Sequence, residues 1–422
     1  MIFWENSARE GFLSDDLMRQ GVHAALDKLG VGKNILIVPP DITRLHSGAS
    51  ALTRYVYEHD PGAVRAILPA LGTHVPMTGP EIALMFGDLP QALFHAHAWR
   101  SDCVTLGEIP ADFVKQVSGG AVDYAIPAAV NRCIVSPDYD CVISIGQVVP
   151  HEVAGFAGQN KNLFVGLGGA ENINKSHFLG AAYGMERIMG RVSTPVRAVF
   201  DYVTDNFLAS VPIVYILTVM ERGGDGAMRP VGLFIGNDRE CFEHAAALSY
   251  RVNFTLLEKP LAKIVVYLDP VEYKSFWLGN KSIYRTRMAM ADHGRLIVLA
   301  PGVEKFGEDG EIDRLIRKFG YHGTGATLAA LDKNEELGNN LSAAAHLIHG
   351  SSEGRFTITY CTGGVSEREV REAGFDYAPV DASLQRYNPE KLSEGHNILA
   401  DGEEVFFIAN PAVGLWASKD RF

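Results

Sequence analysis

The 422-residue chain has no uncharged apolar run near the ~18–20 residues that a membrane-spanning helix needs, so no membrane partner is expected. Cysteine is scarce: the five cysteines are scattered and form no Cys-x-x-Cys pair, which argues against a disulfide framework or a zinc ribbon. Positive charge is also in deficit. Because 38 Lys and Arg face 50 Asp and Glu, the formal net charge is −12, which argues against a nucleic-acid partner. The opening residues lack the basic-then-apolar order of a signal peptide, and a cytoplasmic location is expected.

Glycine, in contrast, is plentiful at 43 residues, about one residue in ten where ~7% is usual. Hydrophobic residues make up 47% and charged residues 21%, which is the balance of a folded globular protein. At a typical ~150 residues per domain, the length predicts more than one domain.

Short apolar runs alternate with amphipathic stretches, which predicts an α/β protein of two domains, each a mostly parallel sheet flanked by helices. The expected elements are strands at 34–38, 64–68, 141–145 and 404–409, and helices at 12–29, 78–86, 176–189 and 277–292. The pattern restarts near Glu258, which predicts an N-terminal domain of residues 1–257 and a C-terminal domain of residues 258–399. The tail 400–422 could return to the N-terminal domain. We expect the active site in the cleft between the two domains.

Polar side chains follow three of the expected strands at their carboxyl ends, where ligands bind in open parallel sheets. They are Asp41 and Arg44 after strand 34–38, His74 after strand 64–68, and His151 and Lys161 after strand 141–145. If these strands are neighbours, the five side chains converge on one crevice. Each also has a structural interpretation: a local Asp–Arg ion pair, two histidines that satisfy backbone groups, and a solvated lysine.

Glycine is densest around Lys161, which suits close approach of backbone to a ligand such as a phosphate. The segment Gly166-Leu167-Gly168-Gly169 lacks the third glycine of a dinucleotide-binding fingerprint, so an NAD-dependent dehydrogenase is disfavoured. His177 follows Lys161 near the start of the next expected helix and could face the same crevice. His95 and His97 form a His-x-His pair, but no carboxylate supports a metal site there.

Several of these residues recur in a recognisable order. They are Asp41-Ile42-Thr43-Arg44, then Gly72-Thr73-His74 with Pro76-Met77-Thr78, then His151, Gly155, Phe156, Gly158 and Lys161, followed by His177. This order and spacing resembles the nickel-pincer nucleotide-dependent lactate racemase family. The resemblance covers nearly the whole chain and is strongest between residues 34 and 180. A weaker match is Trp277-Leu278-Gly279-Asn280-Lys281, which is similar to an aromatic-Gln-x-x-Lys segment of the family.

For the cofactor, the resemblance implies a nickel ion held in a pyridinium-derived dithio nucleotide. Lys161 would tether this cofactor covalently, and His177 would be the nickel ligand, a role that suits imidazole. Further cofactor-binding residues would be Thr73, Gly155, Gly158 and Gly168. Cofactor-maturation proteins would be partners.

For the reaction, the resemblance implies that a 2-hydroxy acid is racemised or epimerised by reversible hydride transfer to the cofactor. His74 and His151 would be the acid/base pair, because the hydroxyl proton points in different directions in the two enantiomers. Substrate-binding residues would be Asp41, Arg44, Trp277, Leu278 and Lys281. Arg44 would hold the substrate carboxylate, with Asp41 orienting it or a nearby histidine.

One position departs from the family pattern. Leu278 stands where lactate-specific members carry Gln, and Phe276 and Trp277 precede it. An apolar wall in place of a polar contact predicts a 2-hydroxy acid other than lactate, with a larger or more apolar side chain.

Two other functions stay open. A zinc-dependent hydrolase or lyase would use the same Asp and His cluster to activate a water molecule, but it leaves Lys161 without a role. A non-catalytic protein that binds a hydroxy acid would use Arg44 and the Gly-rich loop.

Overall fold

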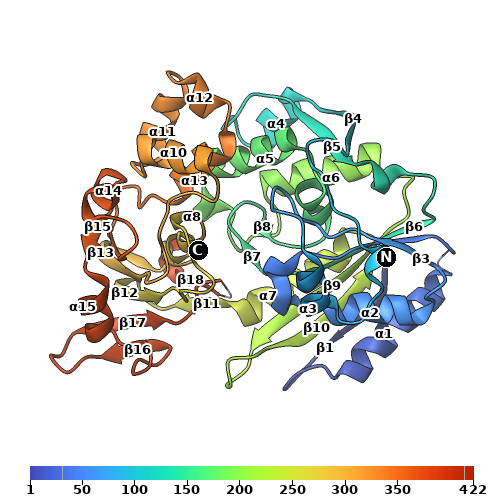
Figure 1. Cartoon of the computed structure of the whole chain (residues 1–422), viewed down its shortest axis with the longest axis horizontal. Helices are drawn as coiled ribbons and strands as arrows, with labels where there is room; N and C mark the ends of the chain where they lie inside the picture. The colour runs from blue at the N-terminus through green and yellow to red at the C-terminus, as the bar shows by residue number, and fades with distance from the viewer. Residues whose placement is uncertain (31, 413) are drawn as a thin grey trace. The chain divides into compact units, whose positions relative to one another are not determined.

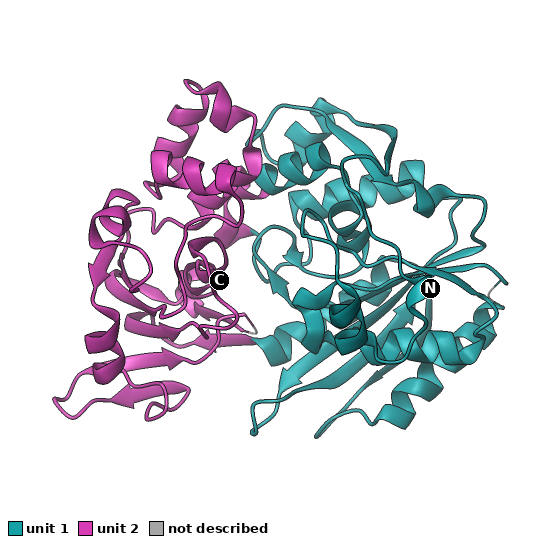
Figure 2. Cartoon of the chain, viewed as in Figure 1, with its two compact units in different colours: residues 1–179, 188–253 teal, residues 180–187, 254–422 magenta. Residues whose placement is uncertain are grey.

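The structure is a computed structural model that describes residues 1–30, 32–412 and 414–422. It divides into two compact units, coloured separately in Figure 2. Unit 1 comprises Met1–Leu179 and Ile188–Asn253, and unit 2 comprises Gly180–Arg187 and Phe254–Phe422. The main division after Asn253 lies close to the boundary expected from the sequence, whereas nothing in the sequence assigns the short segment Gly180–Arg187 to the second unit.

Unit 1 is built on a six-stranded sheet with the order β1-β10-β9-β6-β2-β3 (Figure 1). Its strands are β1 (Ile2–Ser7), β2 (Ile35–Val38), β3 (Val64–Ile67), β6 (Cys141–Gln147), β9 (Ile213–Arg222) and β10 (Met228–Gly236). β9, β6, β2 and β3 are parallel, and β10 and β1 add an antiparallel edge. Two-stranded pairs are β4 (Cys103–Ile109) with β5 (Ile126–Asn131), and β7 (Pro150–His151) with β8 (Gly155–Phe156). The predicted mostly parallel α/β architecture is confirmed for this unit.

The helices of unit 1 are α1 (Asp15–Leu29), α2 (Ala49–His59), α3 (Gly79–Phe86), α4 (Ala111–Val117), α5 (Ala170–Tyr183), α6 (Pro195–Phe207) and α7 (Arg239–Asn253), with α5 ending in unit 2. In α1, α3 and α6 a side chain caps the first turn. The Ser14 side chain accepts a hydrogen bond from the N–H of Leu17 at the start of α1, and Gly30 ends that helix in the left-handed conformation. Thr78 and Glu81 form a reciprocal capping box at α3.

The expected helix at 176–189 is wrong in its bounds, because α5 covers Ala170–Tyr183. Ser176, the first residue of the expected helix, lies inside α5, and its hydroxyl donates to the carbonyl of Ile173. The helix ends at Gly184, whose φ of 105° no helical residue adopts.

Unit 2 contains a second six-stranded sheet with the order β15-β14-β13-β12-β17-β16. Its strands are β12 (Leu261–Tyr267), β13 (Met290–Leu299), β14 (Thr357–Cys361), β15 (Asp376–Ala378), β16 (Gly395–Ile398) and β17 (Glu404–Ile408). All neighbours are parallel except β16 and β17, so the expectation of a second mostly parallel sheet is confirmed. The tail stays in this unit, because β17 pairs with β12 and β18 (Leu415–Ser418) pairs with β11 (Phe254–Leu257). A return of residues 400–422 to the N-terminal domain is therefore wrong.

The helices of unit 2 are mostly short. They are α8 (Phe276–Gly279), α9 (Lys281–Thr286), α10 (Gly310–Phe319), α11 (Thr324–Leu331), α12 (Glu335–Gly338), α13 (Leu341–His349), α14 (Glu367–Glu372) and α15 (Val380–Arg386). The single helix expected at 277–292 is wrong: two short helices meet at Asn280, and Met290 already pairs with Leu261 in the sheet. Of the helices formed by the described residues, none has the length and apolar character that a bilayer crossing requires.

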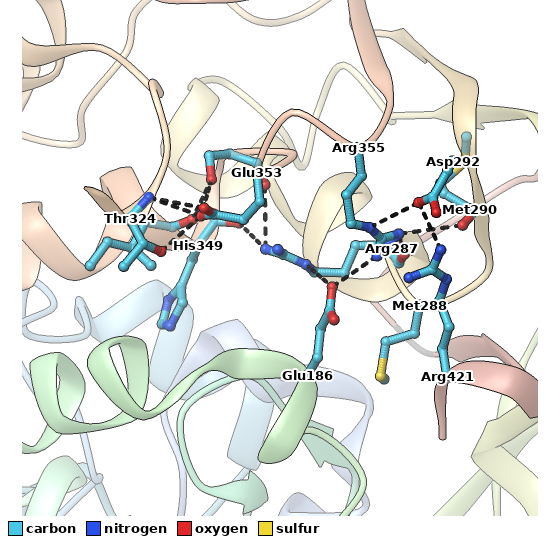
Figure 3. A network of polar contacts seen from close by, with 12 residues as sticks. Glu186, Arg287, Met288, Met290, Asp292, Thr324, His349, Glu353, Arg355 and Arg421 are labelled. Carbon is cyan, nitrogen blue, oxygen red and sulfur yellow. Dashed lines mark hydrogen bonds and ion pairs between the residues drawn. The ribbon is translucent and has the colours of Figure 1, made fainter. Parts of the chain in front are cut away.

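An ionic network around the buried Arg287 joins the segment Gly180–Arg187 to the rest of unit 2 (Figure 3). The Glu186 carboxylate lies 3.0 Å from Nε of Arg287 and 3.1 Å from a terminal nitrogen of Arg355. Arg355 also donates to the carbonyl of Arg287 at 2.9 Å, and its Nε lies 3.4 Å from Asp292. Since the Arg287 side chain is only 7% exposed, Glu186 supplies the charge that makes its burial tolerable.

Candidate functional site

The carboxyl ends of three parallel strands of unit 1 carry most of the residues that the sequence singles out. β2 lies between β3 and β6 and is parallel to both, which confirms that these strands are neighbours. Asp41 and Arg44 follow β2, His74 follows β3, and the segment from His151 to Lys161 follows β6. The N–H of Gly72 donates to the carbonyl of Gly166 at 2.7 Å, which joins the loop after β3 to the loop after β6.

Asp41 and His74 form a hydrogen-bonded pair. Nδ1 of His74 lies 2.7 Å from Oδ2 of Asp41, and the hydroxyl of Thr43 donates to the other carboxylate oxygen at 2.5 Å. Burial alone raises the pKa of Asp41, but the bonds to His74 and Thr43 and the charges of His74 and Arg44 outweigh it, so the net pKa is lowered. An ionised Asp41 accepts the proton of Nδ1, and the neutral ring then carries its lone pair on Nε2. Because the His74 side chain is 56% exposed, this nitrogen is suited to act as a base.

The local Asp–Arg ion pair that the sequence leaves open does not form. Asp41 bonds to His74, and Arg44 contacts Asp41 only through its own backbone N–H, which donates to the Asp41 carbonyl at 3.0 Å. Arg44 lies in the short helix η1 (Ile42–Ser47) and is half-buried. Within the described part of the chain, no hydrogen bond or ion pair engages its guanidinium, which leaves a planar cation suited to a carboxylate.

His151 is held in the opposite tautomer to His74. It is 6% exposed and lies on β7, and its Nδ1 accepts a hydrogen bond from the backbone N–H of Val153 at 3.1 Å. In the neutral ring the proton is therefore on Nε2, which lies 3.9 Å from Glu152. His74 thus presents a lone pair at Nε2, and His151 presents a proton at the same atom.

Lys161 is a half-buried residue whose amine has a lowered pKa. Burial, then the positive charge of Arg44, and further that of Arg197, lower this pKa to about 8, against the opposing charges of Glu152 and Asp41. Among the described residues no hydrogen bond or ion pair engages this amine. A sizeable neutral fraction near pH 7–8 makes it a nucleophile.

His177 lies on α5 and is also kept neutral. Its Nδ1 donates to the carbonyl of Ile173, one turn earlier, at 2.7 Å. Burial and the nearby charge of Lys161 lower its pKa to about 4. The Nε2 lone pair is therefore available, and a backbone bond at the other nitrogen is the usual way in which a metal-binding histidine is oriented.

The glycines around Lys161 are required by contacts within the protein. A Cβ on Gly155 would lie 2.0 Å from the carbonyl oxygen of Arg191, and one on Gly168 would lie 2.0 Å from that of Phe164. Gly158 has a φ of 84° and packs on the backbone of Gln147. Their density therefore reflects tight folding of this loop. Contacts of these glycines and of the exposed Thr73 with a cofactor stay a prediction.

His97 is a structural histidine, as we expect from the sequence. It is 1% exposed, and its Nε2 lies 3.2 Å from the carbonyl oxygen of Gly168. Its Nδ1 lies 2.9 Å from the side-chain amide of Asn131, and burial lowers its pKa. Both ring nitrogens are thus used to fix the turn that precedes α5.

The remaining predicted site residues, Trp277, Leu278 and Lys281, belong to α8 and α9 of unit 2. The Trp277 ring stacks on His346 with 4.0 Å between ring centroids, and Nε2 of His346 lies 3.2 Å from the Trp277 carbonyl oxygen. Leu278 is partly buried, and the Lys281 ammonium lies 5.8 Å from the Tyr273 ring centroid. His346 is a contact that the sequence analysis missed, because nothing in the sequence links it to Trp277.

Arg197 on α6 is the other residue that the sequence analysis missed. It is 1% exposed and donates hydrogen bonds to the loop that carries Lys161. The sequence does contain an indication that Arg197 is buried and partnered, because this charged residue lies among the apolar residues Val196, Val199 and Phe200.

Comparisons with known proteins agree with this architecture. Residues 21–186 match the family model described as lactate racemase N-terminal domain. A lactate racemase of Lactiplantibacillus plantarum is 29% identical over 160 residues, which cover 36% of this chain and 34% of that protein. The match therefore spans about a third of the curated relative's length.

Two solved structures share the fold. A protein from Thermotoga maritima has a TM-score of 0.79 at 24% identity, covering 97% of this chain and 100% of that one. A lactate racemase apoprotein from Thermoanaerobacterium thermosaccharolyticum has a TM-score of 0.72 at 16% identity, covering 95% of this chain and 92% of that one. Residues 21–186 are therefore similar to the N-terminal domain of lactate racemases, and the whole chain shares the fold of the two solved structures.

Proposed function

We propose that this protein racemises or epimerises a 2-hydroxy acid other than lactate, using a nickel-pincer nucleotide attached to Lys161. The observation that carries the proposal is that unit 1 contains both a Lys161 amine without a hydrogen bond or ion pair in the described residues and a His177 ring fixed through Nδ1. A lysine amine with a pKa of about 8 is suited to covalent attachment, and an imidazole with a pKa of about 4 is suited to a metal.

The residues present fit such a group. Lys161 has no hydrogen bond or ion pair within the described residues that attachment would have to break, and the Nδ1 bond of His177 leaves Nε2 as the donor nitrogen. Burial and the charge of Lys161 both lower the pKa of His177, which keeps its imidazole in the neutral form that binds a metal. When bound, the cofactor would supply an acceptor for the hydrogen at C2 of the substrate.

The protein's own groups would bind the substrate and handle its hydroxyl proton. Arg44 would bind the carboxylate and hold it while C2 changes configuration. The Nε2 lone pair of His74 would take the hydroxyl proton of one enantiomer, with Asp41 stabilising the imidazolium that forms. His151 would act as the acid on the opposite side, where its imidazolium form gives the Nε2 proton to the substrate oxygen and becomes neutral. One direction of the reaction starts with His74 neutral and His151 protonated, and the reverse direction starts with His151 neutral and His74 protonated.

The zinc-dependent alternative has less support from the donor set. A catalytic zinc ion takes three protein ligands. Within the part of the chain that the structure describes, no three His, Cys, Asp or Glu side chains form a group able to hold a metal ion. His74 and His151 each spend one ring nitrogen on the protein, and Lys161 has no role in that chemistry.

The proposed substrate follows from Leu278 and Trp277. A partly buried leucine beside a tryptophan stacked on His346 offers an apolar surface rather than a hydrogen bond. We therefore expect a hydroxy acid whose side chain is larger or more apolar than the methyl group of lactate.

The test is to incubate the protein, produced together with cofactor-maturation proteins, with single enantiomers of a panel of 2-hydroxy acids in D₂O. We expect loss of optical purity for an acid with a larger side chain, with hydrogen rather than deuterium at C2. His74→Gln and His151→Gln should abolish turnover, whereas the control His46→Gln, at an exposed histidine, should not. Deuterium at C2 would contradict hydride transfer, and preferred turnover of lactate would contradict the substrate.

A further inference from the structure

The Lys161 loop is held in place by a buried guanidinium. Arg197 is 1% exposed, and one of its terminal nitrogens donates to the carbonyls of Phe156 and, at 3.1 Å, Gly158. Its other terminal nitrogen donates to the side-chain carbonyl of Gln159 at 3.4 Å. All three acceptors lie within five residues of Lys161 along the chain.

Arg197 is a costly residue to bury. No carboxylate forms an ion pair with it in the described residues, and its Nε has no hydrogen-bond partner there. Burial lowers its pKa to about 10, against the opposing charge of Asp201, and its guanidinium lies 4.1 Å from the centre of the Phe242 ring. An apolar side chain at this position would avoid the desolvation of a cation. The hydrogen bonds from the guanidinium to residues 156–159 offset this unfavourable desolvation.

The residues on both sides of Lys161 are fixed as well. The Asn160 amide donates to Asp201 at 2.9 Å, and the hydroxyl of Tyr215 donates to the Asn160 side-chain carbonyl. On the other side, the Asn162 amide donates to the carbonyl of Ile145 at 2.7 Å. Each neighbouring polar side chain is thus bound to the protein.

Gln159, in the same loop, has a backbone conformation that residues other than glycine rarely adopt. Its φ of 53° lies in the left-handed region, which costs a residue other than glycine on the order of 1 kcal/mol. Gln159 is buried at 3% exposure, and its side chain is an acceptor for Arg197. The bond to Arg197 therefore stabilises the backbone conformation from which Lys161 follows two residues later.

We propose that Arg197 is a positioning residue for Lys161, whose three hydrogen bonds fix residues 156–159 so that the Lys161 amine is held in its half-buried place. The charged groups that act on this amine are Arg44, Asp41, Glu152, Arg197 and His177. What becomes attached to Lys161 rests on the proposed function, whereas the positioning of the amine does not.

The experiment measures how acetic anhydride labels Lys161 as a function of pH, by peptide mass spectrometry of the full-length protein. The midpoint for the wild-type protein is expected near the Lys161 pKa of about 8. Arg197→Met removes the hydrogen bonds and the charge, and Arg197→Lys keeps the charge but cannot reach three acceptors. Both variants should raise the midpoint by about one pH unit or more, because the amine becomes hydrated. Backbone amides of residues 156–162 should also exchange faster with D₂O.

The matched control is Arg132→Met. Arg132 likewise donates to backbone carbonyls of a loop in unit 1, those of Ser101 and Asp102, but it does not contact the Lys161 loop. It should leave the Lys161 midpoint unchanged. If Arg197→Met does not fold, Gln159→Asn withdraws one acceptor while tolerating a positive φ, and it should raise the midpoint by a smaller amount.

A midpoint that stays at the wild-type value in Arg197→Lys would overturn the proposal, because charge alone would then suffice. The same midpoint in all variants, with only lower thermal stability, would also overturn it. An Lys161 that carries no cofactor in the cell, together with the expected shifts, would instead reject the proposed function and leave the role of Arg197 standing.

Discussion

Replacing Asp41 by asparagine tests the idea that this carboxylate sets the tautomer of His74. Asp41 is 3% exposed and has two acceptor oxygens in use, one for His74 and one for Thr43. Asparagine keeps the shape but has only one acceptor oxygen. Because the Thr43 hydroxyl is a donor at Oδ1, the amide nitrogen of the substituted side chain would face His74 and donate to Nδ1. The His74 proton then moves to Nε2, and the base is lost.

The expected size of the effect follows from the loss of a correctly protonated general base. General-base catalysis contributes about 10²–10⁴-fold, and holding a catalytic histidine in the wrong tautomer costs toward the upper end of that range. We expect kcat for racemisation to fall about 10³–10⁴-fold, which corresponds to about 4–5.5 kcal/mol of activation free energy. The KM should change little, since Arg44 rather than Asp41 binds the substrate carboxylate.

The assay is chiral chromatography of the racemised acid, combined with ¹⁵N NMR of the histidine rings in the same samples. Thr43→Val is the matched control: it removes one hydrogen bond to Asp41 but leaves the carboxylate facing His74, so kcat should fall less than about 10-fold. A folded Asp41→Asn protein with nearly full activity would show that the Asp41 carboxylate is not needed to set the tautomer of His74. A His74 ring that keeps its proton on Nδ1 in that variant would show the same.

Three further predictions concern other parts of the chain. Leu278→Gln should move preference toward lactate in competition assays with two hydroxy acids, and unchanged preference would reject the apolar wall. Glu186→Gln should lower the free energy of unfolding of unit 2 by about 2–3 kcal/mol in urea, because it leaves the buried Arg287 without its carboxylate. His97 has a folded-state pKa below its usual 6.5, so the stability that it contributes is present above pH 6.5 and is lost as the pH falls through the lowered value. His97→Gln should therefore flatten the decline in unfolding free energy as the pH falls below 6.5, whereas an unchanged slope would show that His97 is not responsible.

The parallel strands and the capped helices of unit 1 could be predicted because their signals are local. β2 is a continuous apolar run, β6 is mostly apolar and buried, and Thr78 with Glu81 marks the start of α3. The order of the strands then brings Asp41 and His74 together without further information.

The errors arose where distant contacts outweigh local pattern. Residues 277–292 have helical periodicity, yet Met290 is drawn into β13 by pairing with Leu261. Local sequence also does not show why glycines are needed near Lys161: Gly155 and Gly168 are required by the backbone at Arg191 and Phe164, and their contact with a ligand stays a prediction. The contacts of Met290 with Leu261 and of Gly155 with Arg191 join residues that are far apart in the sequence, so a local pattern does not reveal them.

Arg197 illustrates the same limit within the site. Its position in an apolar run indicated burial with a partner, but the partners are backbone carbonyls, which every residue type carries. Because any residue type can supply a backbone carbonyl, the sequence of the partner segment does not indicate such a contact. Positioning residues of this kind are therefore the hardest part of a site to predict.

In the proposed function, Lys161 and His177 together hold a nickel-containing nucleotide. The most direct measurement is the intact mass and nickel content of the protein produced with cofactor-maturation proteins, compared with Lys161→Arg and His177→Gln. We predict a nucleotide-sized adduct located at Lys161 with one nickel ion, no adduct in Lys161→Arg, and an adduct with little nickel in His177→Gln. An unmodified Lys161 in protein that carries stoichiometric zinc would contradict a nickel-nucleotide site at these two residues.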